Sequence, residues 1–440
     1  MKKLLPAFLL TAACGAGLVD HDGFALPPNG SGLHCSETQL DCGTGVCVNP
    51  DSDVNNCGAC GNLCATPQHA TSKCEASVCG FTCNPGFFPC GPQNETCCPA
   101  SSIAAGGDTS CAVVDTNVEC WGSNDSGQLG FSPVGAPFSA KPVKVPGVSA
   151  ASSVAVGGHH ACAIVAGSGQ VRCWGANDFG QLGAAGSGMV TVPGVAGALL
   201  LALGDRHSCA VTGAGTFCWG ANDFGQLGHG PIGGTAGPTA IAGFAFNSIS
   251  AGTGFTCGIG SGATYCWGDG SKGQFGDGNA DAPSATPVAI GGLSNIAAVA
   301  AGTSHACAIG SSTFGWGNDD FGQASGDGRP ATLSPVKGIS GAQSPLMVAA
   351  GIEHSCVVSG TRDVVCWGGN GFAQLGLGVT SGVQKPVAVP GLAGVQALTV
   401  GARHTCAQTA DNAVYCWGAN LSGQAAAPAS TVVVSPRPID

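Results

Sequence analysis

A tryptophan-containing motif that occurs seven times constrains the fold of this 440-residue chain more than any other feature. It contains every tryptophan of the sequence, each followed by glycine and then by a turn that ends in Gly-Gln or Ala-Gln: Trp121, Trp174, Trp219, Trp267, Trp316, Trp367 and Trp417. Successive copies lie 45 to 53 residues apart. A period near fifty residues is typical of units that stack or form a ring, because each unit is too small to bury its own apolar face. The motif therefore predicts a repeat architecture and argues against one continuous enzyme core.

The clearest single unit spans residues 154–192. It contains short apolar runs at 154–156, 160–165, 171–174 and 190–192, separated by polar or glycine-rich turns. Four short strands joined by such turns form one blade of a propeller. The composition agrees, since only 9% of the residues are charged and 75 of the 440 are glycine. We therefore expect an all-β fold, a seven-bladed β-propeller over residues 99–440.

The repeated residues resemble the regulator of chromosome condensation repeat. That family's motif is an apolar-Gly-x-x-His strand followed by a Trp-Gly-x-Asn-x-x-Gly-Gln-Leu-Gly loop, and it implies seven blades around a shaft. The resemblance covers about residues 100–440, with local departures. Gly270 replaces Asn in the fourth copy, Ala324-Ser325 replaces Leu-Gly in the fifth, and Ala373 replaces Gly in the sixth.

The two ends of the repeat region suggest how the ring closes. The first copy begins at Ser102 without the Pro-Val strand that leads the others, such as the strand at 141–143. The chain ends with a similar segment at 435–439. We expect this C-terminal strand to complete the first blade, because closure removes two exposed sheet edges.

The N-terminus has the pattern of an export signal. Lys2 and Lys3 precede an apolar run from Leu4 to Ala13, about half the ~20 residues that cross a bilayer. The run ends at Cys14 in a segment similar to a bacterial lipobox, with Thr11 where that motif has leucine. We interpret residues 1–14 as a signal peptide that leaves Cys14 lipidated, with simple cleavage as the alternative. Residues 15–34, rich in Pro, Gly and Ser, form a linker.

Residues 35–98 contain twelve cysteines and few aliphatic residues, so cross-links must take the place of a hydrophobic core. They are Cys35, Cys42, Cys47, Cys57, Cys60, Cys64, Cys74, Cys79, Cys83, Cys90, Cys97 and Cys98. We expect a module of six disulfides whose connectivity the sequence leaves open. Two other interpretations are a thioredoxin-like pair at Cys57 and Cys60, and a zinc site that adds Cys64. Asp51 and Asp53 could offer oxygens to calcium, but a turn is the simpler interpretation.

Twelve further cysteines lie in pairs nine to eleven residues apart, one on the second and one on the third strand of a unit. The pairs are Cys111 with Cys120, Cys162 with Cys173, Cys209 with Cys218, Cys257 with Cys266, Cys356 with Cys366, and Cys406 with Cys416. Antiparallel neighbours lie within disulfide reach, so we expect six hairpin disulfides, with buried free thiols as the alternative. The fifth unit has Gly315 in place of one cysteine, which leaves Cys307 single.

Two further side chains recur at fixed places. Five units carry a histidine at the start of the second strand, where Thr109 and Phe255 stand in the others: His160, His207, His305, His354 and His404. These imidazoles could bind metal or relay protons, but we interpret them as structural, each satisfying backbone groups of its own blade. Phe179, Phe224, Phe321 and Phe372 occupy the Asn-x-x-Gly-Gln loops of units two, three, five and six. We expect them either to form a contact surface on one face or to pack against their own blades.

Composition and motifs also limit the function. The net charge is −11 and the basic residues are scattered, which argues against nucleic-acid binding. No catalytic constellation, metal site or cofactor motif stands out. We expect an exported protein of the outer membrane or cell surface, or a secreted one, that contacts the membrane only through a lipid anchor. It would bind a protein or other macromolecule of the cell surface. The family resemblance implies that bacterial relatives include secreted inhibitors that cap β-lactamases. It also implies the alternative of guanine-nucleotide exchange on a small GTPase; a propeller lyase or glycosidase is a third possibility.

Overall fold

The structure is a computed structural model that describes residues 35–43, 46–91, 94–186, 188–327, 331–339, 341, 343–426 and 428–439. The signal peptide, Cys14 and the linker lie outside these residues. The chain divides into two compact units, residues 1–82 and 83–440. The described residues form strands and turns, with no helix long and apolar enough to cross a membrane.

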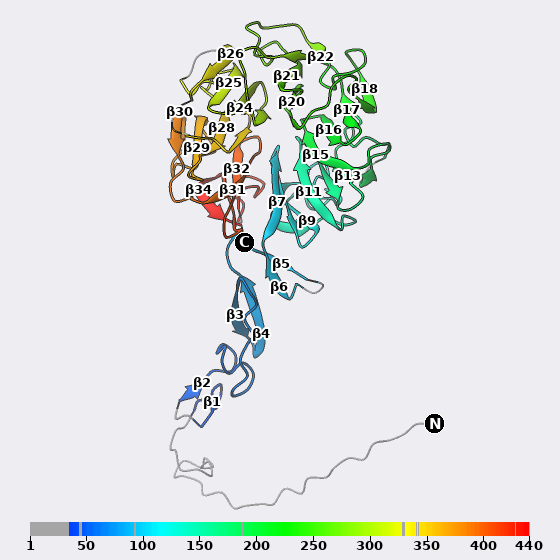
Figure 1. The fold of residues 1–440 in the computed structure, drawn as a ribbon. Coiled ribbons are helices and arrows are strands. Elements are labelled where there is room, and N and C mark those ends of the chain that lie inside the picture. The colour runs from blue at the N-terminus through cyan, green and yellow to red at the C-terminus, as the bar shows by residue number, and fades with distance from the viewer. Residues whose placement is uncertain are drawn as a thin grey trace, which may run out of the picture. The chain divides into compact units, whose positions relative to one another are not determined.

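The second unit contains seven four-stranded antiparallel sheets, the blades of a propeller (Figure 1). In each blade the strands follow one another in chain order, and we name them A to D from the centre of the ring outwards. The A strands are β7 (Ala100–Gly106), β11 (Ala151–Val156), β15 (Ala198–Leu203), β19 (Ser248–Ala251), β23 (Ala298–Ala301), β27 (Met347–Ala350) and β31 (Val395–Val400). The B strands are β8 (Thr109–Val114), β12 (His160–Val165), β16 (His207–Thr212), β20 (Phe255–Gly260), β24 (His305–Ile309), β28 (His354–Val358) and β32 (His404–Thr409).

The two outer strands complete each blade. The C strands are β9 (Asn117–Ser123), β13 (Gln170–Gly175), β17 (Gly215–Ala221), β21 (Ala263–Gly268), β25 (Thr313–Asn318), β29 (Val364–Asn370) and β33 (Val414–Ala419). The D strands are β10 (Phe138–Lys144), β14 (Val190–Thr191), β18 (Thr235–Ala240), β22 (Ser284–Ala289), β26 (Ala331–Lys337), β30 (Ser381–Ala388) and β34 (Val432–Pro438). The expected all-β, seven-bladed architecture is confirmed.

The C-terminal strand does not complete the first blade, contrary to our expectation. Strand β34 pairs with β33 in blade seven, and blade one already has its own D strand, β10, which contains the Lys-Pro-Val segment at 141–143. The Pro-Val segments therefore end each unit and do not begin the next one. The ring closes without a shared sheet, because strand β31 of blade seven lies beside strand β7 of blade one. There the backbone N–H of Ala105 donates to Thr399 Oγ1 at 2.8 Å.

Proline protects the exposed outer edges of the blades. Six of the seven D strands contain at least one proline, and in each of them a proline lies where the register shifts: Pro142, Pro238, Pro287, Pro335, Pro386 and Pro436. Proline has no N–H to offer a further strand, and a bulge interrupts a straight edge. The seventh D strand, β14, is only two residues long. All seven edges therefore resist edge-to-edge aggregation.

Buried tryptophans join each blade to the one before it. All seven indole rings are almost completely buried. Each Nε1–H donates to the carbonyl oxygen of the motif glutamine in the preceding blade, at 2.8 to 3.1 Å. The same contact joins blade one to blade seven, where Trp121 donates to Gln424. The Trp-Gly repeat thus forms the contacts between blades, and this explains why it recurs once per unit.

Disulfides cross-link the B and C strands of six blades. The structure pairs Cys111 with Cys120, Cys162 with Cys173, Cys209 with Cys218, Cys257 with Cys266, Cys356 with Cys366, and Cys406 with Cys416, as the spacing predicts. The two cysteines of each pair lie directly opposite in the ladder, with Cα atoms 4.0 to 4.1 Å apart. The alternative of buried free thiols therefore does not apply to these twelve residues.

Blade five lacks the hairpin disulfide, as the sequence predicts. Cys307 lies opposite Gly315 in the ladder and remains a buried free thiol. A Cβ at Gly315 would overlap the carbonyl oxygen of Ala324, so no larger residue fits there. The backbone of this blade thus leaves no room for the second cysteine.

The first unit is held by disulfides rather than by a core. Its described residues contain the strand pairs β1 (Leu40–Asp41) with β2 (Cys47–Val48) and β3 (Ala70–Glu75) with β4 (Val78–Cys83). Four disulfides link it: Cys35–Cys47, Cys42–Cys60, Cys57–Cys74 and Cys64–Cys79. Cys57, Cys60 and Cys64 are each bonded to a different partner, so neither the redox-pair nor the zinc interpretation applies.

The compact unit that holds the propeller begins earlier than the expected boundary at residue 99. It includes the hairpin of β5 (Phe88–Cys90) and β6 (Thr96–Cys98), with disulfides Cys83–Cys97 and Cys90–Cys98. Phe88 packs in one buried cluster with Trp121 and Ile439. The backbone N–H of Gly86 donates to the carbonyl of Ile439 at 2.8 Å. The hairpin therefore belongs to the propeller, next to blades seven and one.

Candidate binding face

One face of the propeller carries two loops from every blade. Because strands A to D alternate in direction, the A–B and C–D loops lie at the same end of each sheet. In all seven blades a backbone hydrogen bond joins them, as from Ala176 N–H to the His159 carbonyl at 2.9 Å. We call this end of the ring the loop face. It contains all four phenylalanines of the Asn-x-x-Gly-Gln motif.

The motif's amides hold the C–D loops in shape. In each blade the side-chain oxygen of the motif glutamine accepts from the backbone N–H two residues earlier, as Gln226 does from Phe224 at 2.9 Å. Asn222 Oδ1 accepts from the Leu227 N–H at 3.1 Å, and its amide donates to two carbonyls. In blade five Asp319 takes the asparagine's place, a further departure from the repeat, and accepts from two backbone N–H groups. The phenylalanines therefore stand on rigid loops.

Phe224 and Phe321 are the exposed rings of the set. The two residues are 41% and 40% exposed, although large apolar groups tend to be buried. They lie on the C–D loops of blades three and five, with blade four between them. In blade four Lys272 occupies the corresponding position. The other two rings, Phe179 and Phe372, are half-buried, and the contact-surface role of the exposed pair stays a prediction.

Arginines cover Phe179 and Phe372. The guanidinium carbon of Arg206 lies 4.5 Å from the centre of the Phe179 ring, and that of Arg403 lies 4.7 Å from the centre of Phe372. Each arginine belongs to the A–B loop of the next blade and directly precedes the buried histidine. The exposed aromatic surface of the loop face is therefore restricted to blades three and five. The sequence did carry the signal, as an arginine before the histidine.

The five histidines form a buried ring that a ligand cannot reach. Each Nε2 lies 2.7 to 3.0 Å from a serine or threonine hydroxyl of the next blade, not from backbone groups of its own blade as we expected. Each of these five hydroxyls in turn donates to the carbonyl of a motif glutamine, at 2.8 to 3.0 Å. Since the hydroxyl hydrogen is used there, the imidazole must donate from Nε2.

Burial keeps the imidazoles neutral. It lowers the pKa of four of them from 6.5 to about 3, and that of His207 to about 4. The Nδ1 atoms have no hydrogen-bond partner among the described residues and lie against the first glycine of each A–B loop. At Gly401, for example, a Cβ would overlap the His404 ring. The contacts of these histidines therefore support the structural interpretation.

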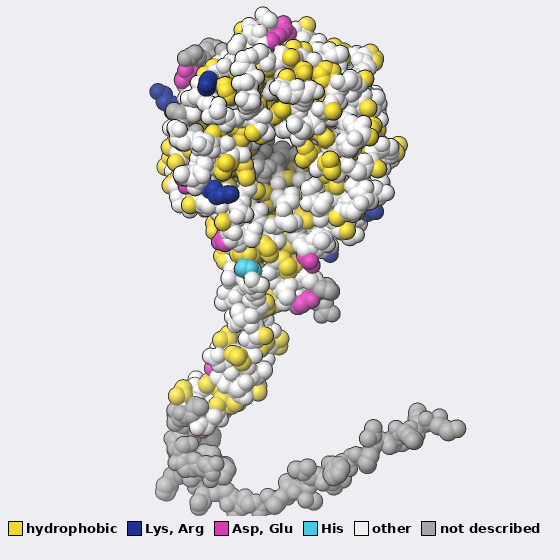
Figure 2. Space-filling view, in the orientation of Figure 1, with side chains coloured by type: hydrophobic (Ala, Val, Ile, Leu, Met, Phe, Trp, Pro, Cys, Tyr) yellow, Lys and Arg dark blue, Asp and Glu magenta, His cyan; other side chains and the backbone are white. Residues whose placement is uncertain are grey.

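A cavity of about 370 Å³ lies at the centre of the ring, towards the loop face, where Figure 2 shows a hollow. Its walls are the A strands and A–B loops of all seven blades, mostly small or aliphatic residues. Asp205 is the only charged residue among the described residues that line it. One carboxylate does not provide the paired groups that acid–base chemistry uses.

Comparisons with known proteins agree with this architecture. Two models of the Regulator of chromosome condensation (RCC1) repeat match the chain. One matches residues 118–164, 215–259, 261–309 and 363–408, and the other matches 151–181, 348–374 and 395–424. Together they cover more than half of the chain. A search of curated protein sequences finds no relative.

Solved structures show the same fold at low sequence identity. Human WBSCR16 is 18% identical with a TM-score of 0.65, and the match covers 79% of this chain and 94% of that one. Prp20p from Saccharomyces cerevisiae, described with its binding properties to Gsp1p and histones, is 20% identical with a TM-score of 0.63, over 74% and 86% of the two chains. With its seven Trp-Gly motifs, seven blades and these matches, the chain belongs to the regulator of chromosome condensation repeat family.

Proposed function

We propose that this protein is an exported, surface-anchored propeller that binds another macromolecule through the loop face. The observation that carries the proposal is the exposure of Phe224 and Phe321 on that face, on loops that hydrogen bonds hold rigid. Binding energy between proteins concentrates in a few such aromatic anchors, and rigid loops lose little entropy on association. The buried histidines and a central cavity whose described lining has a single carboxylate support binding rather than catalysis.

The cysteines support an extracytoplasmic location. Twelve disulfides link the described residues, and such density is typical of an oxidising compartment. The apolar run before Cys14 supports export, with Cys14 as the lipid-bearing residue of an outer-membrane or cell-surface protein. An oxidising location also makes exchange on a small GTPase the weaker proposal.

The partner should be captured from the cell envelope by the full chain made soluble with Cys14→Ser. Replacing Phe224 and Phe321 together by serine should weaken capture by at least about 2 kcal/mol, if both are anchors. A matched control replaces Val383 and Val434, which are exposed on the D strands β30 and β34, by serine. Loss of capture in the control but not in the phenylalanine variant would contradict the proposal.

A further inference from the structure

Two of the four loop phenylalanines already bind a cation, and that cation comes from this chain. Arg206 lies over Phe179 and pairs with the Asp205 carboxylate at 3.3 Å. Arg403 lies over Phe372 and its guanidinium is 3.8 Å from the Glu353 carboxylate. A guanidinium over an aromatic face is attracted by the ring's electron density, and a nearby carboxylate adds Coulomb attraction. At two places on the loop face, therefore, a phenylalanine ring binds a guanidinium group.

At the other two phenylalanines the repeat supplies no cation. Arg206 and Arg403 each directly precede the B strand of the blade that follows their phenylalanine. In the blade that follows Phe224 this position holds Gly254, and in the blade that follows Phe321 it holds Glu353. Gly254 lies against the Phe224 ring and has no side chain to place over it. Glu353 is a carboxylate, which an aromatic face repels, and it faces Arg403 instead. This explains why these two rings are the exposed ones.

The surroundings of the two exposed rings are acidic. Asp223 and Asp320 directly precede them in sequence and are exposed. Across the described A–B and C–D loops the carboxylates that are not buried are Asp108, Asp125, Asp178, Asp205, Asp223, Asp269, Asp277, Asp281, Asp320, Asp327 and Glu353. The lysines and arginines of the same described loops are Arg206, Lys272 and Arg403, and two of these are engaged with rings. The face therefore complements a positively charged partner.

We propose that Phe224 and Phe321 are acceptor sites for arginine side chains of a partner protein, which take the positions that Arg206 and Arg403 occupy over the other rings. The partner is then a protein with an arginine-rich segment able to reach blades three and five. This inference rests on the proposed function and adds the chemistry of the ligand.

The test uses the full-length Cys14→Ser chain and a fluorescent hexa-arginine peptide, with binding followed by anisotropy at constant ionic strength. Phe224→Leu with Phe321→Leu keeps an apolar side chain at both positions and removes both π faces. Since each exposed cation–π contact contributes a factor of about two to five, the double variant should bind about four- to twenty-fivefold more weakly. The matched control, Phe179→Leu with Phe372→Leu, alters rings that the chain's own arginines cover, and should change binding less than about twofold.

A second variant should gain binding. Arg206→Gln uncovers Phe179 and should strengthen hexa-arginine binding relative to Arg437→Gln, which removes the same charge from strand β34. The proposal is overturned if the two phenylalanine double variants lose hexa-arginine affinity equally, or if neither loses any. It is also overturned if hexalysine binds as tightly as hexa-arginine. If hexa-arginine binding is insensitive to the rings while capture of the envelope partner still requires Phe224 and Phe321, the arginine inference fails and the proposed function stands.

Discussion

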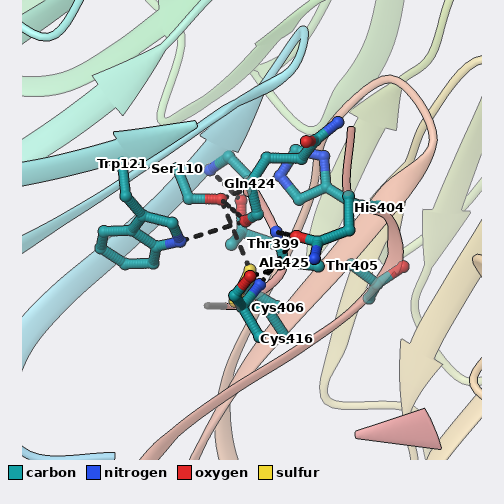
Figure 3. Close-up of a disulfide and its surroundings, with 12 residues drawn as sticks. Ser110, Trp121, Thr399, His404, Thr405, Cys406, Cys416, Gln424 and Ala425 are labelled. Atoms are coloured by element: carbon teal, nitrogen blue, oxygen red, sulfur yellow. Dashed lines mark hydrogen bonds between the residues drawn. A yellow bond between two sulfur atoms is a disulfide. The ribbon is translucent and has the colours of Figure 1, made fainter. Parts of the chain in front are cut away.

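His404 Nε2 in blade seven lies 2.9 Å from the hydroxyl of Ser110 in blade one, and this contact closes the ring (Figure 3). The Ser110 hydroxyl donates in turn to the Gln424 carbonyl at 3.0 Å, which also accepts from Trp121. Residues from opposite ends of the repeat region thus form one buried network at the seam. The same network recurs wherever a blade has the histidine.

The sequence itself follows this pairing. The two blades that lack the histidine have Thr109 and Phe255, and the next blade then has Ala161 or Ala306 where the others have serine or threonine. A hydroxyl with no imidazole to bond would be a buried polar group with one partner fewer, so alanine replaces it. The histidine and the hydroxyl therefore act as one unit across each seam.

Ser110→Ala should destabilise the propeller by about 1–3 kcal/mol, because it leaves the Nε2–H of His404 buried without an acceptor. Ser110→Thr should cost less, since Thr256 and Thr405 fill the same position in blades four and seven. Urea unfolding under non-reducing conditions measures both. Equal stability of the alanine variant and the parent would show that the contact adds nothing to ring closure.

Acid should destabilise the protein from about pH 6.5 downwards. The five buried imidazoles have pKa values lowered to about 3 or 4, whereas in the unfolded chain they protonate near 6.5. Between these values the unfolded state binds more protons than the folded state. The free energy of unfolding therefore decreases as the pH is lowered, by up to about 1.4 kcal/mol per pH unit for each histidine. Burial raises the pKa of Glu119 to about 7, which gives one opposing contribution between pH 4.5 and 7. A urea midpoint that stays constant from about pH 7.5 to about pH 5 would contradict the buried neutral ring.

Removal of residues 431–440 should leave the ring closed. The deletion takes away strand β34 and exposes the edge of β33, and it removes Ile439 from its buried cluster. The seam contacts of His404 and Gln424 lie outside the deleted segment. We expect lower stability and a tendency to aggregate, with unchanged hydrogen-exchange protection of strands β7 and β8. Selective loss of protection in these two strands would show that the C-terminal strand does close the ring.

A side chain at position 315 should destabilise blade five. Gly315→Ala places a Cβ against the Ala324 carbonyl and should cost more than about 1 kcal/mol, whereas Gly371→Ala meets open space and should change stability little. In the parent protein Cys307 should resist alkylation until unfolding, because burial raises the pKa of its thiol to about 12. Mass mapping of the native protein that finds Cys307 modified would contradict this.

The repeated motif made the fold predictable. Features that involve two neighbouring units were not predicted. Seven copies of Trp-Gly and the cysteine pairs indicate blades and opposed strands because each feature acts within one unit. The C-terminal strand was assigned to the wrong blade because a Pro-Val segment between two units can end one or begin the next. An arginine precedes the histidine in the blades that follow Phe179 and Phe372, but its contact with the ring joins neighbouring blades, so the spacing within a unit does not reveal it.

Photocrosslinking in cells that express the protein tests the binding face most directly. A crosslinking amino acid is placed at Phe224 or Phe321, or for comparison at Val383 or Val434 on the D strands. The account predicts a discrete adduct from positions 224 and 321 that disappears when the other of these two phenylalanines is replaced by serine, and none from positions 383 and 434. Adducts from the D-strand positions alone would contradict the central claim that the loop face is the binding surface.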